Sequence, residues 1–299
     1  SRITTLPKTL IRHMKDHFRI GTLACAKHVT AADGTEKFLF RLRDGESVET
    51  VLIPDKDRRT ICLSTQVGCR YGCPFCASGL KSFERNLTPG EITDQVLCVE
   101  EQSGETITNV VFMGMGEPLD NLENVLTGIR IMNHEKALNI GARRITISTC
   151  GVIPAIRRLG DFEVQTELSL SLHAPDNRLR NKLVPANRKY PLPELLDACK
   201  AYIGKKNRMI TLEYLLLQNV NDSMQQANQL AEIAEMLRAK VNLICFNTFS
   251  GLPYKTPDPN RVDAFRERLR QRGTRATVRK SRGQDISAAC GQLAARPPS

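Results

Sequence analysis

The sequence has no tryptophan, few other aromatic residues and no long apolar run. Aromatic residues make up 5% of the 299 residues, and the longest apolar stretches, at residues 109–115 and 241–246, fall well short of the roughly 18 to 20 residues that span a bilayer. The N-terminus shows no apolar segment of the kind found in a secretory signal. These absences exclude a membrane-spanning protein and predict a soluble, cytoplasmic protein with no membrane partner.

Acidic residues are also scarce relative to basic ones. The chain has 32 Asp and Glu against 43 Lys and Arg, which gives a net charge of +11. A positive excess favours a polyanionic partner, because the neutralised phosphates release counterions. A charge that only maintains solubility is the other interpretation, and composition alone leaves both open.

Ten cysteines remain to be explained in a chain without a secretory signal. Disulfide scaffolds are typical of short secreted chains, so a reducing compartment fits this sequence better. Free thiols in such a chain serve as buried small hydrophobic residues, metal ligands or nucleophiles. Their spacing has to distinguish these uses.

The order of apolar patterns predicts an α/β protein. Residues 6–18 predict a short basic helix, and two alternating segments around Asp44 and Gly45 predict a β-hairpin. From residue 60 onward strands alternate with helices, with strands expected at residues 60–65, 107–113, 144–149, 164–172, 209–217, 241–246 and 275–280. About six such units predict a parallel sheet covered by helices, either doubly wound or a partial barrel, with functional residues just after the strands.

Polar residues at expected helix starts support this division. Thr88 and Glu91 have the spacing of a capping box, and the helix they begin is expected to end near Gly104. Asp222 and Asp258 are expected to cap two later helices. We divide the chain into an N-terminal helix and hairpin extension (1–54), a β/α domain (55–293) and a tail (294–299).

Three cysteines follow the first β/α strand at C-x3-C-x2-C spacing: Cys69, Cys73 and Cys76. Structural zinc sites take four protein ligands, and no second cysteine pair lies nearby. Three thiolates suit a [4Fe-4S] cluster that keeps one iron open for a ligand. Three buried cysteines without a metal, and a non-catalytic Fe-S or zinc RNA-binding protein, are the alternatives.

This cysteine spacing, followed by Pro-aromatic-Cys, resembles the signature of radical S-adenosylmethionine (SAM) enzymes. Six segments are similar to the RlmN/Cfr family of radical SAM RNA (adenine) methyltransferases, namely residues 64–69, 85–87, 113–119, 169–175, 183–190 and 285–293. The resemblance implies a radical SAM partial (β/α)6 barrel with a small N-terminal β-hairpin/helix extension, the remnant of an accessory RNA-binding domain. It also implies a [4Fe-4S] cluster on the three cysteines and two SAM molecules per turnover.

The resemblance implies a SAM-binding role for seven residues at expected strand ends. Taken alone, each would be an ordinary turn or cap residue. They are Gly116, Glu117, Ser148, Ser171, Leu172, His173 and Asn247.

Three further residues receive catalytic roles from the resemblance. Cys290 is the cysteine that is methylated first, Cys62 is the thiol that resolves a protein–RNA adduct and leaves a Cys62–Cys290 disulfide, and Glu49 is the proton acceptor. Without the resemblance, either thiol would more often be an inert buried group, and Glu49 an exposed strand carboxylate. An intermediate carrier makes chemical sense, because C2 of adenine is electron-poor and does not attack SAM. We expect the other cysteines, Cys25, Cys98, Cys150, Cys199 and Cys245, to be structural. For Cys150, which directly follows the Ser148 strand end, a place near SAM is the alternative.

Two basic segments flank the expected active rim. Residues 261–282 hold nine Arg or Lys and two acidic residues. The second segment contains Arg178, Arg180, Lys182, Arg188 and Lys189. RNA phosphates are the expected partner of both, and the target adenosine has to leave its stack to react.

The resemblance implies a methyltransferase that acts on C2 of adenosine 2503 in 23S rRNA and, as in some family members, on adenosine 37 of tRNA. We expect the protein to be a monomer. Methylation of C8 of the same rRNA nucleotide, as in Cfr-like members, is the close alternative. An electron donor such as flavodoxin is expected to supply the reducing electron.

Overall fold

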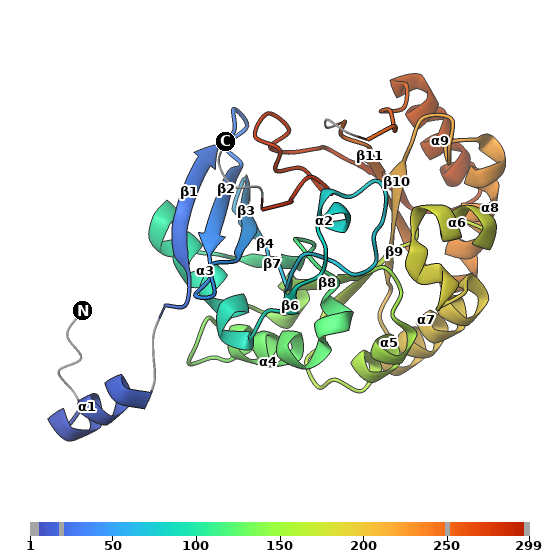
Figure 1. Ribbon diagram of the computed structural model, residues 1–299. Helices are drawn as coiled ribbons and strands as arrows, with labels where there is room; N and C mark the ends of the chain where they lie inside the picture. Colours follow the sequence, from blue (N-terminus) through green and yellow to red (C-terminus); the bar gives the residue numbers. More distant parts are fainter. Residues whose placement is uncertain (1–5, 18–20, 249–251, 296–299) are drawn as a thin grey trace.

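A ten-stranded sheet forms the centre of the molecule (Figure 1). The computed structural model describes residues 6–17, 21–248 and 252–295. Its strand order is β1-β2-β3-β4-β7-β8-β9-β10-β11-β12. A separate two-stranded sheet, β5 (Gln66–Val67) with β6 (Arg85–Asn86), stands apart from it.

The N-terminal extension joins this sheet directly. It comprises helix α1 (Lys8–His17) and strands β1 (Ala24–Thr30), β2 (Glu36–Arg41) and β3 (Ser47–Asp55). The expected helix and the hairpin around Asp44 and Gly45 are confirmed, since β2 pairs with β3 in antiparallel register. Strand β1 was not predicted, because six of its seven residues are exposed and it lacks an apolar face. Strand β3 then pairs antiparallel with β4, so extension and barrel share one sheet.

The remainder of the sheet is parallel. Its strands are β4 (Arg58–Cys62), β7 (Asn109–Phe112), β8 (Ile145–Thr149), β9 (Glu167–Ser171), β10 (Thr211–Leu216), β11 (Lys240–Cys245) and β12 (Ala276–Arg279). The helices between them are α3 (Pro89–Ser103), α4 (Leu122–Asn133), α5 (Ile153–Gly160), α6 (Asn177–Leu183), α7 (Leu192–Lys206), α8 (Met224–Leu237) and α9 (Pro259–Gln271). Short 3-10 turns are η1 (Pro118–Asn121), η2 (Ala142–Arg144) and η3 (Pro185–Arg188), and helix α2 (Ala77–Leu80) lies in the cysteine loop.

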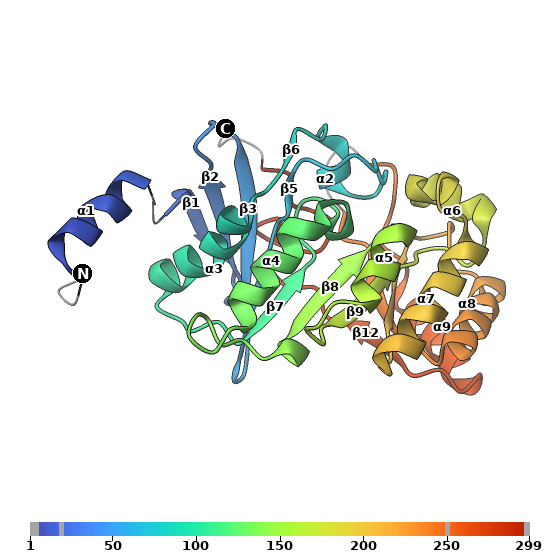
Figure 2. The ribbon, with the colours of Figure 1, turned by 90° about the horizontal axis from the view of Figure 1, so that it is seen from below.

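Six β/α units followed by a last strand make a partial barrel. Among the described residues β12 pairs only with β11, so the barrel stays open. The predicted partial (β/α)6 barrel is therefore confirmed. Figure 2 shows α3, α4, α5 and α7 along the outer side of the sheet, while the cysteine loop and the C-terminal segment lie toward its other side.

Local sequence signals explain where the helices start. The Thr88 side chain accepts a hydrogen bond from the Glu91 amide and the Glu91 side chain accepts one from the Thr88 amide, which confirms the capping box of α3. Asp258 caps α9 as expected. The expected cap of α8 was off by one residue, because Ser223 makes a capping box with Gln226. Asp222 instead accepts a hydrogen bond from the Asn219 amide in the turn before it.

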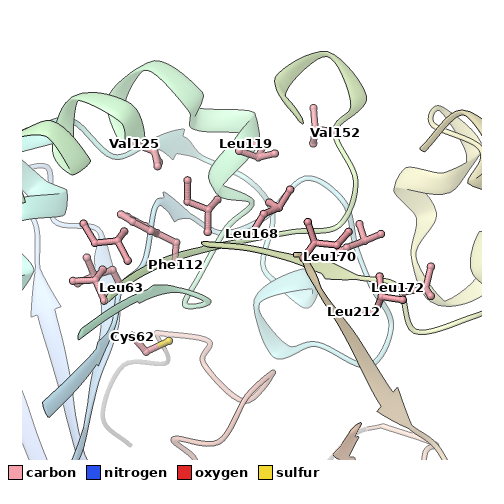
Figure 3. Packing of buried hydrophobic residues seen from close by; sticks show 14 of the residues in the cluster. Cys62, Leu63, Phe112, Leu119, Val125, Val152, Leu168, Leu170, Leu172 and Leu212 are labelled. Carbon is pink, nitrogen blue, oxygen red and sulfur yellow. The ribbon is translucent and has the colours of Figure 1, made fainter. Parts of the chain in front are cut away.

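The core fills the space between the sheet and the outer helices. Figure 3 shows Leu119, Val125 and Val152 on the helix side of the strands, and Cys62 on the opposite side, facing the C-terminal segment. Phe112 is fully buried between them. No helix of the described chain is long and apolar enough to cross a membrane.

Candidate active site

The cysteine loop is closed at its base by the β5–β6 pair. Two glycines let it fold tightly. A Cβ on Gly79 would lie 2.8 Å from the carbonyl oxygen of Cys73, and a Cβ on Gly68, where φ is +72°, would overlap the carbonyl of Ser82. The loop therefore presents its three cysteines within one compact turn.

Cys69, Cys73 and Cys76 line a common cavity. Burial raises the pKa of Cys69 to about 12 and raises the pKa of Cys73 and Cys76 as well. Thiols in such surroundings stay protonated unless a cationic metal centre binds them. The site has the donors for such a centre but no internal charge that would make three thiolates on its own.

The donor set suits an iron-sulfur cluster. Three thiols from one loop line the same cavity, and three thiolates hold a [4Fe-4S] cluster while one iron stays open for a ligand. A structural zinc site normally takes four protein ligands.

The predicted strand-end residues meet at the same cavity. Gly116, Glu117, Ser148, Ser171 and His173 all line it. The Ser148 and Ser171 hydroxyls, from neighbouring strands β8 and β9, lie 3.3 Å apart. Leu172 is fully buried beside them. Asn247 lines a second, small cavity, and its side-chain oxygen accepts a hydrogen bond from the side-chain amide of Gln284.

Glu117 is held in place by the backbone around it. Its carboxylate accepts hydrogen bonds from the amides of Leu119, at 3.0 Å, and Cys150, at 2.8 Å. Burial raises the pKa of this carboxyl group, and the two amides oppose the shift. A carboxylate so fixed at the cavity wall can bind an ammonium group.

His173 is a neutral donor at the cavity wall. It adopts the left-handed conformation, with φ of 56°. Its Nδ1 accepts a hydrogen bond from the Leu215 amide, which leaves the proton on Nε2. Burial, and next the nearby Arg180 guanidinium, lower its pKa to about 3. The Phe75 ring packs edge-on against it at 5.0 Å.

Cys290 reaches the cavity from the C-terminal segment. The Ala77 amide donates a hydrogen bond to the Gly291 carbonyl at 2.7 Å, so the cysteine loop and the Cys290 segment are bonded directly. Cys290 is exposed, and neighbouring protein groups still remove part of the water around its thiol. This desolvation raises its pKa, and the nearby Arg279 guanidinium opposes the shift.

Cys62 and Glu49 lie behind this wall and do not line the cavity. Burial raises the pKa of Cys62 to about 12, and the neighbouring Cys290 adds to the shift. Glu49 accepts hydrogen bonds from the amides of Ala294 and Ala295, at 2.8 and 3.1 Å, and pairs with Lys37. It therefore anchors the chain that follows Cys290.

One expectation about these thiols was wrong for this structure. All ten cysteines are free, so the expected Cys62–Cys290 disulfide is not present in this structure. Cys150, expected to be structural, does line the cavity next to Glu117, because the β8–α5 turn directs it inward.

The structure moves one predicted RNA-binding cation into the interior. Arg180 is 0% exposed, whereas Arg178 and Lys182 on the same helix are exposed. Its guanidinium donates hydrogen bonds to the carbonyls of Cys150 and Leu172. Helix α6 lays that side against the ends of β8 and β9, so the expectation that Arg180 belongs to an RNA surface was wrong.

Sequence reasoning missed Glu213 on β10. This buried carboxylate lines the cavity and accepts hydrogen bonds from Ser169, at 3.2 Å, and Asn242, at 2.7 Å. Burial raises its pKa. In the sequence, the sign that Glu213 has a function was its place as a single acidic residue within a largely apolar strand.

Comparison with known proteins agrees with this geometry. The sequence profile of the Radical SAM superfamily matches residues 63–231. A relative from Thermotoga neapolitana, described as a probable dual-specificity RNA methyltransferase RlmN, is 49% identical over 293 residues, covering 97% of this chain and 85% of the relative. A dual-specificity RNA methyltransferase RlmN from Desulfotalea psychrophila is 48% identical over 274 residues, covering 88% of this chain and 75% of the relative.

A solved structure extends the similarity to three dimensions. The crystal structure of a radical SAM methyltransferase from Sphaerobacter thermophilus matches with a TM-score of 0.94 at 47% identity, covering 98% of this chain and 87% of that one. This chain belongs to the RlmN/Cfr family of radical SAM RNA methyltransferases. The family predicted from the motifs is therefore confirmed. Radical SAM proteins in general use a [4Fe-4S] cluster and SAM, so membership implies both cofactors.

The RlmN/Cfr assignment covers more of the site than the superfamily match does. The superfamily profile ends at residue 231, so it includes the cysteine loop and the strand ends through β10. Asn247 and Cys290 lie beyond it, within the part shared with the RlmN relatives.

Proposed function

We propose that this chain is an RNA methyltransferase that adds a methyl group to C2 of an adenosine, at position 2503 of 23S rRNA and at position 37 of tRNA. The observation that carries the proposal is one cavity lined by the three loop cysteines, the β7–β9 strand ends and Cys290. The dual specificity in the names of the RlmN relatives supports two RNA substrates.

When bound, a [4Fe-4S] cluster on the loop cysteines supplies the electron that cleaves SAM into methionine and a 5′-deoxyadenosyl radical. The chain's own residues hold SAM. The Glu117 carboxylate binds its ammonium group, and the Ser148 and Ser171 hydroxyls and the His173 Nε2–H group offer hydrogen bonds to its polar atoms.

Cys290 is the methyl carrier in this proposal. C2 of adenine is not a nucleophile, so the Cys290 thiolate accepts a methyl group from one SAM molecule by displacement. A second SAM provides the radical that removes a hydrogen atom from this S-methyl group, which gives two SAM per turnover. The Arg279 guanidinium favours the thiolate form of Cys290 by its charge.

Cys62 and Glu49 complete the reaction. Cys62 faces the C-terminal segment from β4 and lies next to Cys290. Attack of its thiolate on the Cys290 sulfur would break the bond from that sulfur to the carbon attached to the RNA and form a transient S–S bond, which an external reductant then reduces to the two thiols. Glu49 accepts the ring proton, and its hydrogen bonds to Ala294 and Ala295 keep it next to the same segment.

Two exposed cations of α6 border an RNA-binding groove. Arg178 and Lys182 lie one turn apart and line a groove between α6 and α8 together with Gln225 and Gln229. Both helices follow strands of the barrel, so the groove lies on the rim that carries the cavity. Asp176, the acidic residue of the groove, caps α6 through the Leu179 amide. Unpaired cations and amides at such a place suit RNA phosphates.

Mass spectrometry of digested RNA tests the position of the methyl group. The reconstituted enzyme, with SAM and reduced flavodoxin as electron donor, is expected to give 2-methyladenosine in 23S rRNA and tRNA fragments. The Cfr-like alternative predicts 8-methyladenosine, and its appearance alone would overturn the assignment to C2.

Two cysteine variants test the roles of the thiols. Cys290→Ala should abolish both the S-methylcysteine peptide and RNA methylation. Cys62→Ala should retain the S-methylcysteine peptide and accumulate RNA covalently attached to protein. S-methylation found elsewhere in the Cys290→Ala variant would refute the role of Cys290.

Anaerobic reconstitution separates the enzyme from a non-catalytic RNA-binding protein. About four irons per chain and release of 5′-deoxyadenosine from SAM are expected. One bound zinc and intact SAM would instead support the non-catalytic alternative.

A further inference from the structure

Arg180 joins two strand ends at the wall of the cavity. Its Nε donates to the carbonyl of Leu172 at 3.2 Å, and its Nη2 donates to the carbonyls of Cys150, at 2.5 Å, and Ser171, at 3.3 Å. Cys150 follows β8, Ser171 is the last residue of β9, and Leu172 follows it. One side chain therefore fixes the backbone from which the predicted SAM-binding residues of these two strands extend.

A buried amide network fixes the guanidinium in turn. Its Nη1 donates to Asn187 Oδ1 at 2.8 Å. The Asn187 amide nitrogen donates to Asn177 and Asn181 on α6, and Asn177 also accepts the Leu192 amide at the start of α7. The guanidinium position is thus determined by α6, η3 and α7 together.

The Arg180 charge has no carboxylate partner. The side chain is 0% exposed, and no ion pair to it is found in residues 6–17, 21–248 and 252–295. Burial accordingly lowers its pKa. Placing a cation in the interior without an anion is costly, and hydrogen bonds to carbonyls offset only part of that cost.

The cavity provides a place for the missing negative charge. Negative charge on Cys150 or Cys73 would interact favourably with the Arg180 guanidinium, and both thiols line the cavity. A cluster core bound by thiolates is anionic, and reduction by one electron makes it more so. A fixed cation behind the wall stabilises that added charge.

We propose that Arg180 is a positioning residue that sets the SAM-binding ends of β8 and β9 and supplies the positive charge that balances a thiolate-bound cluster. The inference rests on the proposed radical SAM function and adds a residue to its machinery. Arg180 makes two contributions in this proposal: the forked hydrogen-bond geometry of its guanidinium and its positive charge. Different substitutions remove them.

Three variants of the holoenzyme distinguish these contributions. Arg180→Met removes both charge and donors, and Arg180→Lys keeps the charge but not the fork. Arg157→Met is the matched control, because Arg157 is an exposed arginine in the last turn of α5. Each is reconstituted anaerobically, checked by circular dichroism and iron content, and measured for SAM affinity and for the midpoint potential of the cluster by EPR-monitored titration.

Arg180→Met is expected to lower the equilibrium constant for reduction of the cluster at least tenfold. For one electron this corresponds to a midpoint potential about 59 mV lower. Arg180→Lys should keep the wild-type potential. Both should bind SAM roughly 10- to 100-fold more weakly, as do other changes around ligating groups. Arg157→Met should change neither quantity.

Wild-type potential and SAM affinity in an iron-loaded Arg180→Met protein would overturn the inference. If Arg180→Met does not fold, Arg180→Lys decides, and unchanged SAM affinity in that variant counts against the role of Arg180. The four-iron content and SAM cleavage of the wild type are established first. A failure of the proposed function is therefore seen before, and separately from, a failure at Arg180.

Discussion

His173 illustrates how a single residue at the cavity combines backbone strain, burial and a fixed tautomer. Its left-handed conformation places the ring against Phe75, and the Leu215 amide occupies Nδ1. Non-glycine residues seldom adopt this conformation without support from their surroundings. The neutral imidazole is therefore a built-in feature of the folded site.

This burial predicts a pH dependence of stability. The unfolded imidazole binds a proton near its ordinary pKa of 6.5, whereas the folded one does so only near 3. Stability present above pH 6.5 is lost as the pH falls toward 3, by about 2 kcal/mol at pH 5. His173→Asn keeps an acceptor and tolerates the left-handed backbone, so its free energy of unfolding should fall by about 2 kcal/mol less between pH 7 and pH 5. Urea unfolding of the apoprotein measures this, with exposed His134→Asn as control, and an identical pH dependence in wild type and His173→Asn would contradict it.

Gly116 predicts a different kind of sensitivity. Its φ is +95°, and a Cβ there would lie 2.5 Å from Gln66 Cβ and 2.9 Å from the Gln66 amide nitrogen. Gly45 is the matched control, with φ of +89° and no atom within 4 Å of the added Cβ. Both alanine variants bear the left-handed cost, but only Gly116→Ala adds overpacking of about 1 to 3 kcal/mol. Calorimetry should give Gly116→Ala a melting temperature roughly 2 to 12 °C below that of Gly45→Ala, and equal melting temperatures would show that the β7 turn yields to the added methyl group.

The residues differ in how far the sequence could foretell them. The spacing of Cys69, Cys73 and Cys76 and the glycine next to Glu117 were visible in the chain, and the structure brings them to one cavity. Arg180 was not foreseeable, because local sequence does not show which side of a seven-residue helix faces two strand ends. Glu213 had only the weak signal of one acid in an apolar strand.

At the scale of elements, apolar periodicity and caps predicted most strands and helices. Strand β8 alternates apolar and polar residues and lies within one residue of its predicted limits. Helix α9 begins directly after its predicted cap, Asp258. Strand β1 escaped prediction because its partner β2, rather than its own pattern, determines its place. Pairing of this kind is a tertiary effect that propensity does not contain.

Helix α6 carries the prediction that belongs to this scale. If Arg178 and Lys182 each contact one RNA phosphate, replacing either by Gln should lower the slope of log affinity against log salt by about 0.7 to 0.9. Arg157→Gln is the control, because Arg157 is exposed in the last turn of α5 and does not line this groove. Filter binding of an RNA fragment at several salt concentrations measures the slopes. Equal slopes for Arg178→Gln, Lys182→Gln and wild type would remove this groove from the RNA interface.

At the scale of the whole molecule, the N-terminal extension holds the C-terminal segment over the cavity. Asp33 accepts a hydrogen bond from the Gly283 amide and Asp285 accepts one from the Ala32 amide, each at 3.0 Å. Lys37 donates to the Ser287 carbonyl at 3.2 Å. Because β3 also pairs with β4, the two ends of the chain and the barrel support one another around Cys290.

The double variant Asp33→Ala/Asp285→Ala should loosen this closure without unfolding the barrel. Each lost hydrogen bond is worth about 0.5 to 1.5 kcal/mol, so local opening of residues 283–290 should become about tenfold more frequent. Hydrogen exchange with mass spectrometry should show faster exchange there and unchanged exchange in α8, and Asp57→Ala, in the exposed turn between β3 and β4, serves as control. If exchange at residues 283–290 equals that of the wild type, then Glu49 and the cysteine loop hold the Cys290 segment alone. In that case the N-terminal extension would stabilise the sheet but would not hold the segment that carries Cys290.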